Sequence, residues 1–146
     1  MTLYRSIRVT IIATALVIYS GCAHQPETLY TQIGGQPAID QIADSFIHEI
    51  EFNEDVIAYF KGVDIKAFRQ HFTSHLCMTL DGPCEFKGKN IKEAHAGMGI
   101  NTADFNTTVD LLVNAMTSTG ISHRLQNKVL ARLAPMRKDI IEPDGN

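Results

Sequence analysis

The amino-acid sequence predicts an all-α domain, and two observations carry that prediction. Apolar residues recur at spacings of three and four through nearly every segment between residues 36 and 140, which is the period of a helix with one buried face. The apolar and polar alternation of a strand is absent from the sequence. With 146 residues, 45% of them hydrophobic and 20% charged, the chain has enough apolar material for one compact core.

The charge of the chain argues against a nucleic-acid partner. The net charge is -3, and no run of lysine or arginine marks a basic face. We therefore expect no nucleic acid among its partners.

Two helices are predicted in the first part of the periodic region. The first runs from about residue 36 to residue 50, with Pro37 in its first turn and Phe46 on its inward face. Asn53 can cap a short second helix, which stops at Gly62.

The third predicted helix begins after Asp64, which can cap it. Helical spacing sorts its side chains into two neighbouring stripes, Phe68, Phe72, Leu76 and Thr79 on one and His71, His75 and Met78 on the other. Residues 80–90 contain Gly, Pro and charged residues and are predicted to form a loop.

A short helical stretch then presents His95 at its end. Gly97 and Gly99 follow it and permit the chain to turn away. A histidine at a helix end is usually a surface or capping residue, but one held in this way also suits a proximal haem ligand.

Two further helices complete the domain. Asn101 or Thr102 can cap the first of them, which ends near Gly120. Ser122 starts the last helix, and Pro135 is expected to kink it or end it early.

The N-terminal residues have the layout of a signal peptide. Arg5 and Arg8 precede an apolar stretch from Val9 to Tyr19, which as a helix covers only about half of the ~30 Å hydrocarbon core of a bilayer. The Ser-Gly-Cys sequence ending at Cys22 resembles a bacterial lipoprotein signal. We expect a leader over residues 1–21, a linker over 22–28 and export to the periplasmic side as a lipoprotein anchored to the membrane at Cys22; an ordinary signal or an uncleaved anchor is the alternative.

Cys77 and Cys84 admit two interpretations. In an exported protein they can form a disulfide, and they can equally be two small hydrophobic residues. A redox-active dithiol is not expected, because the spacing is not Cys-x-x-Cys.

Five of the phenylalanines that precede His95 can line an apolar slot for a flat ligand or form an ordinary aromatic core. They are Phe46, Phe60, Phe68, Phe72 and Phe86.

Four segments resemble, in the right order, the motifs of the first group of truncated haemoglobins. Leu29–Gly35 is similar to the opening motif, Ala58–Gly62 to the phenylalanine turn, Leu80–Pro83 to the second glycine motif and His95–Ile100 to the proximal-histidine motif. The resemblance spans residues 29 to about 137 and so covers nearly all of the chain after the leader.

The resemblance implies a globin domain over residues 29–141, followed by a tail over 142–146. Its fold is a two-over-two helical sandwich around haem b, with His95 as the axial iron ligand and Phe60 on the porphyrin face. The remaining residues expected around the cofactor are Phe46, Ile47, Phe68, His71, Phe72, Phe86, Ile100 and Phe105.

The side of the haem opposite His95 departs from the family pattern. Where the family commonly has a tyrosine after Phe46, this chain has Ile47, and Phe68 and Phe72 make the pocket more apolar still. His71 matches a position from which some members bind the iron when no gas is present, and it can instead contact a haem propionate or lie exposed. His75 is expected at the surface or rim.

The function implied is the binding of a diatomic gas: oxygen, nitric oxide or carbon monoxide. The resemblance also implies oxygen transport or the conversion of nitric oxide to nitrate with an external reductase as possible roles, and we assert no enzyme class. The alternatives are a six-coordinate ligand sensor or electron-transfer protein, with His71 as sixth ligand, and a helical interaction lipoprotein without haem.

Overall fold

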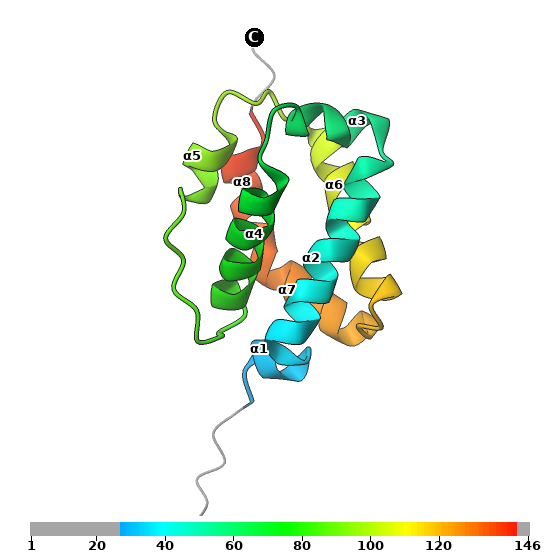
Figure 1. Cartoon of the computed structure of the whole chain (residues 1–146), viewed down its shortest axis with the longest axis vertical. Coiled ribbons are helices and arrows are strands. Elements are labelled where there is room, and N and C mark those ends of the chain that lie inside the picture. The colour runs from blue at the N-terminus through cyan, green and yellow to red at the C-terminus, as the bar shows by residue number, and fades with distance from the viewer. Residues whose placement is uncertain (1–26, 143–146) are drawn as a thin grey trace, which may run out of the picture.

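The computed structural model describes residues 27–142, and within that range every regular element is a helix (Figure 1). The prediction of an all-α fold is therefore confirmed. The predicted leader, Cys22 and the last four residues of the predicted tail lie outside the described residues. No helix between residues 27 and 142 combines the length and apolar character needed to cross a membrane.

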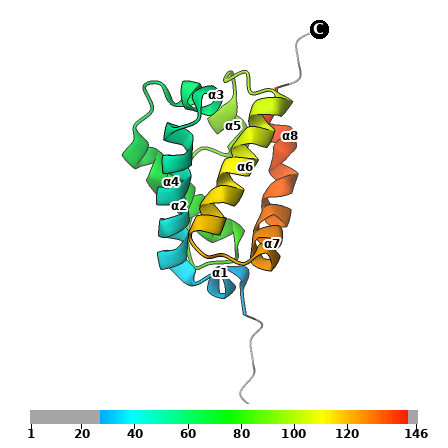
Figure 2. The same cartoon turned by 90° about the vertical axis from the view of Figure 1, so that its right-hand side faces the viewer.

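Helix α2 (Gly35–Glu51) is the centre of the arrangement. It packs against α4 (Ile65–Thr79) on one side and against α6 (Thr102–Ser118) on another, as the two views in Figures 1 and 2 show. Helix α7 (His123–Leu133) lies against α6 and against the short α1 (Leu29–Gln32).

The buried faces of α2, α4 and α6 form the core. The residue spacing that predicted these helices also brings their apolar side chains together, because residues three and four apart share a helix face. Val56, Leu80 and Val129, which lie outside these three helices, complete the core. The largest fully buried side chains are Ile39, Ile42, Leu76, Leu80, Met116, Val56, Val129 and Cys77.

Three polar residues begin helices as predicted. The side chains of Asn53, Asp64 and Asn101 each accept a hydrogen bond from a backbone N–H in the first turn of α3 (Glu54–Ile57), α4 and α6. Asn101 is therefore the cap of α6, and Thr102 is its first helical residue. Helix α3 continues into a 3₁₀ turn, η1 (Ala58–Phe60), before the chain turns at Gly62.

Pro135 interrupts the last helix, as expected. After α7 the chain forms a 3₁₀ turn, η2 (Ala134–Met136), and then α8 (Arg137–Ile140), because proline lacks the N–H that a continuous helix needs. Helix α1 was not predicted, because it is too short for a helical period to show in its sequence.

A disulfide joins Cys77 in α4 to Cys84 in the following loop, which decides between the two interpretations of these cysteines. The turn between them is tightly packed. A Cβ atom on Gly82 would lie 2.6 Å from Cys77 Sγ and 2.7 Å from Tyr30 Cδ2, so only glycine fits there. The disulfide and the ring of Tyr30 together fix the start of the loop.

Candidate functional site

A short, strongly capped helix, α5 (Ile91–His95), presents His95. Asn90 and Glu93 form a capping box in which each side chain accepts a hydrogen bond from the backbone N–H of the other. This pairing stabilises a helix that has only five residues.

The ring of His95 is oriented by a backbone carbonyl. His95 Nδ1 lies 2.7 Å from the carbonyl oxygen of Ile91, one turn earlier in α5. Because a carbonyl oxygen only accepts, Nδ1 carries the proton in this hydrogen bond, and in the neutral imidazole Nε2 is left with a free electron pair. A neutral imidazole with its second nitrogen fixed in this way is the form that binds iron.

Four of the nominated phenylalanines form one continuous cluster. The ring centroids of Phe46 and Phe72 are 5.1 Å apart, those of Phe68 and Phe72 are 5.8 Å apart, and those of Phe60 and Phe68 are 4.9 Å apart. The rings come from α2, η1 and α4, so the tertiary structure brings together three separate segments. The cluster therefore forms one aromatic, apolar surface built from three parts of the chain.

The fifth phenylalanine, Phe86, lies in the loop after the disulfide and packs against two histidines of α4. Its ring meets that of His75 edge-on at 5.2 Å and that of His71 at 6.3 Å. A Cβ on Gly88 would lie 2.4 Å from the Phe86 ring, so the loop closes tightly around this side chain.

The two histidines differ in burial. His71 is exposed, whereas His75 is half-buried. Burial lowers the pKa of His75, and the charge of a protonated His95 lowers it further, which favours the neutral imidazole at His75.

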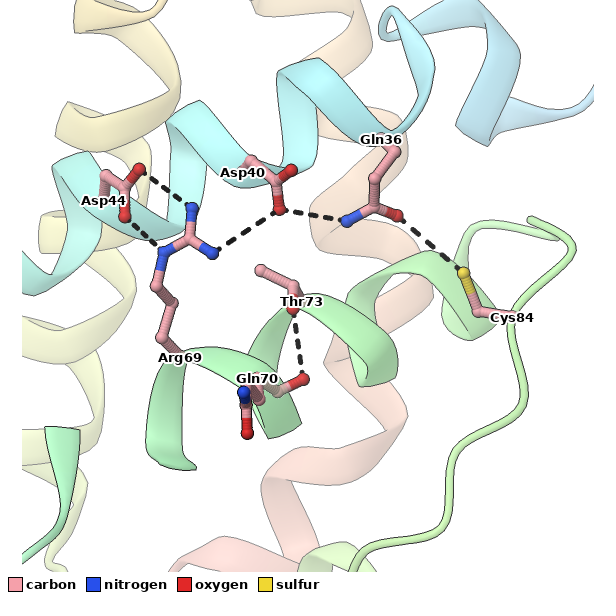
Figure 3. Close-up of polar contacts among 7 residues, drawn as sticks. All are labelled: Gln36, Asp40, Asp44, Arg69, Gln70, Thr73 and Cys84. Carbon is pink, nitrogen blue, oxygen red and sulfur yellow. Dashed lines mark hydrogen bonds and ion pairs between the residues drawn. The ribbon is translucent and has the colours of Figure 1, made fainter. Parts of the chain in front are cut away.

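Polar and charged side chains link α4 to α2 (Figure 3). Arg69 donates to Asp44 over 2.5 and 2.9 Å, and its other terminal nitrogen lies 3.8 Å from Asp40. Gln36 in turn donates to Asp40, and its carbonyl oxygen lies 3.8 Å from the Cys84 sulfur. The guanidinium of Arg69 lowers the pKa of Asp44, so both groups are charged at neutral pH.

The structure also describes the three other nominated residues, Ile47, Ile100 and Phe105. Ile47 follows Phe46 on α2 and is half-buried, and Ile100 is buried just after the glycine-containing turn that follows α5. The guanidinium carbon of Arg137 lies over the ring of Phe105, on α6, at 5.6 Å from the ring centroid. The carbonyl of Ile91 was not nominated from the sequence, although a carbonyl four residues earlier is within reach of any helical side chain.

Comparison with known proteins identifies the family. The profile of the bacterial-like globin family matches residues 28–142. The chain is 31% identical to a group 1 truncated hemoglobin of Nostoc sp. (strain MUN 8820), over 78% of this chain and 97% of the relative. It is 29% identical to the group 1 truncated hemoglobin of Tetrahymena pyriformis, over 81% of this chain and 98% of the relative.

Solved structures agree with the sequence relatives. The crystal structure of truncated hemoglobin from Tetrahymena pyriformis in its Fe(III) form superimposes with a TM-score of 0.75, covering 78% of this chain and 97% of that chain at 29% identity. The 2/2 hemoglobin of Synechococcus sp. PCC 7002 shares the fold with a TM-score of 0.73 at 22% identity. The chain therefore belongs to the bacterial-like globin family, as a relative of the group 1 truncated haemoglobins.

Proposed function

We propose that this protein binds haem b through His95 and takes up a diatomic gas on the opposite face of the haem. Membership of the globin family implies haem-based gas binding. The observation that supports His95 as the iron ligand is its hydrogen bond from Nδ1 to the carbonyl of Ile91, which leaves Nε2 free. Bound haem would supply the iron at which the gas is held.

The described residues fit that cofactor. His95 offers one neutral nitrogen, and Phe46, Phe60, Phe68 and Phe72 form an aromatic surface suited to a porphyrin. Arg69 and its two carboxylate partners also connect α4, which carries Phe68 and Phe72, to α2, which carries Phe46.

The presence or absence of hydrogen-bond donors on the haem face opposite His95 affects which gas is bound. Oxygen gains negative charge when iron binds it and is stabilised by a hydrogen-bond donor, whereas carbon monoxide depends less on one. Ile47, Phe68 and Phe72, which we place on that side, carry no donor in their side chains. We infer that the pocket favours carbon monoxide and nitric oxide over long retention of oxygen, so oxygen transport and nitric oxide dioxygenation receive little support from these three residues.

A visible spectrum of the purified protein after haem addition tests the proposal. We expect a Soret band in the wild type and in the His123→Ala variant, which changes an exposed histidine on α7. His95→Ala should lose or severely weaken haem binding. Absence of a Soret band in the wild type would support the non-haem helical module instead.

The same spectra separate gas binding from the six-coordinate alternative. A split low-spin visible band in the gas-free, dithionite-reduced protein would indicate a second axial side chain. Loss of that band in His71→Ala would identify His71 as the ligand and favour a ligand sensor or an electron-transfer protein.

We further propose that the protein is exported and anchored at Cys22, with an electron-donating reductase as a partner if the haem turns over. The proposal of export rests on the basic and apolar layout of residues 1–21. Mass spectrometry of the membrane fraction tests it, since a lipid-modified Cys22 at the N-terminus is expected and an unprocessed chain in the soluble fraction would contradict it.

A further inference from the structure

We propose that Glu142 is a positioning residue for His95. By holding the turn that follows α5, it would determine how firmly the imidazole of His95 is presented to iron. This inference rests on the proposed function of His95 as the iron ligand.

Glu142 is bonded to both ends of that turn. Its carboxylate accepts a hydrogen bond from the backbone N–H of Gly97, and its own backbone N–H donates to the carbonyl of Ile100 over 3.0 Å. Gly97 is only two residues beyond His95, whereas Glu142 is 45 positions further along the chain from Gly97. Glu142 thus connects the C-terminal end of the domain to the histidine helix.

The turn needs such an external contact because the helix does not continue through it. Ala96 is extended, with φ -60° and ψ 130°, and Gly97 and Gly99 have φ of +76° and +66°. Within the turn, the N–H of Met98 donates to the carbonyl of His95 over 3.2 Å. A five-residue helix followed by two glycines in the left-handed region has little rigidity of its own.

Neighbouring contacts connect Glu142 to α5 and to the protein interior. Helix α8, which ends two residues before Glu142, packs against α5 itself. Ile100, whose carbonyl receives the Glu142 N–H, is only 8% exposed and anchors the far end of the turn in the protein interior. The carboxylate bond to Gly97 is charge-assisted, which makes it stronger than a hydrogen bond between neutral groups.

The test compares Glu142→Ala and Glu142→Gln with the wild type, all loaded with haem. Alanine removes the acceptor, while glutamine keeps an amide oxygen but loses the charge. Asp139→Ala is the matched control, because it removes a carboxylate from α8 that makes no hydrogen bond or ion pair among residues 27–142.

Two measurements are made on each variant. The first is the rate of haem transfer to excess apomyoglobin, which we expect to rise about tenfold in Glu142→Ala and less in Glu142→Gln. The second is electron paramagnetic resonance of the ferrous protein with nitric oxide, in which a weaker bond between iron and His95 increases the fraction of five-coordinate nitrosyl haem. That fraction should rise in Glu142→Ala and remain at the wild-type value in Asp139→Ala.

The outcomes separate this inference from the proposed function. Equal haem transfer and equal nitrosyl spectra in Glu142→Ala and wild type would overturn the inference alone. Faster haem loss with an unchanged nitrosyl spectrum would show that Glu142 only stabilises the fold, and would also overturn it. A wild type that takes up no haem would overturn the proposed function and this inference together.

Discussion

Reduction of the disulfide between Cys77 and Cys84 should lower the stability of this protein by an amount that follows from its position. The two cysteines are seven positions apart, so the bond closes a short loop. For a loop of about eight residues, the loss of chain entropy in the unfolded state corresponds to about 2.5 kcal/mol. At about 2.1 cal/mol/K per residue, the unfolding entropy of residues 28–142 is about 0.24 kcal/mol/K. Dividing the loss of about 2.5 kcal/mol by this entropy predicts that Tm falls by about 10 °C.

The assay is thermal unfolding with and without a phosphine reductant, followed by circular dichroism. The ferrous carbon monoxide form is used, because the reductant then leaves the iron in the same oxidation state. A double variant, Cys77→Ala with Cys84→Ala, is the control: its Tm should not respond to the reductant. Thiol labelling with mass detection confirms that the bond is intact at the start of each scan.

The reasoning would be refuted by a disulfide that is present in the wild type but whose reduction leaves Tm unchanged. A local effect is also expected, because the disulfide ties Cys84 to α4 only two residues before Phe86, which packs against His75. Reduction should therefore increase amide hydrogen exchange in residues 85–90 more than in α6.

Three further predictions concern single side chains. Ile47→Tyr adds a donor beside the gas and should slow oxygen dissociation about tenfold or more in stopped-flow measurements; an unchanged rate would contradict our placement of Ile47. Tyr59 donates to Asp104, which raises the Tyr59 pKa to about 12 from 10, so its contribution to stability is complete below pH 10 and is lost as the pH rises toward 12. Tyr59→Phe should cost about 1 kcal/mol in urea denaturation at pH 7 and less at pH 11, and an equal cost at both would argue against the bond. Because Arg69 lowers the pKa of Asp44, the ionised Asp44 stabilises the fold above the pKa it has in the unfolded chain, and this contribution is lost on acidification. Arg69→Gln should raise the Asp44 pKa in an NMR titration, but it should change the free energy of unfolding by less than about 1 kcal/mol because the pair is exposed. An unshifted Asp44 pKa in this variant would exclude Arg69 as the cause.

The helices were largely predictable because the interactions that start and stop them are local. Asn53, Asp64 and Asn101 each bond to a backbone group three residues away, and this can be recognised in the sequence without knowing the fold. Pro135 ends a continuous helix for a reason that lies within the residue itself.

The candidate site was predictable only in part. The sequence nominated His95 and the phenylalanines, and the order of the motifs identified the family. The sequence could not distinguish His71 from His75 in burial, because both lie on the same stripe of one helix. In the folded chain the ring of Phe86 lies closer to His75 than to His71.

By itself, then, the sequence determined the longer helices, the caps at Asn53, Asp64 and Asn101, and the family to which the chain belongs. Only the tertiary structure decided that Cys77 bonds to Cys84, that three segments bring their phenylalanines into one cluster and that Glu142 holds the turn after His95. The physical reason is that caps and helix periods depend on neighbours three or four residues apart. A carboxylate and an amide 45 positions apart meet only once the whole chain has folded.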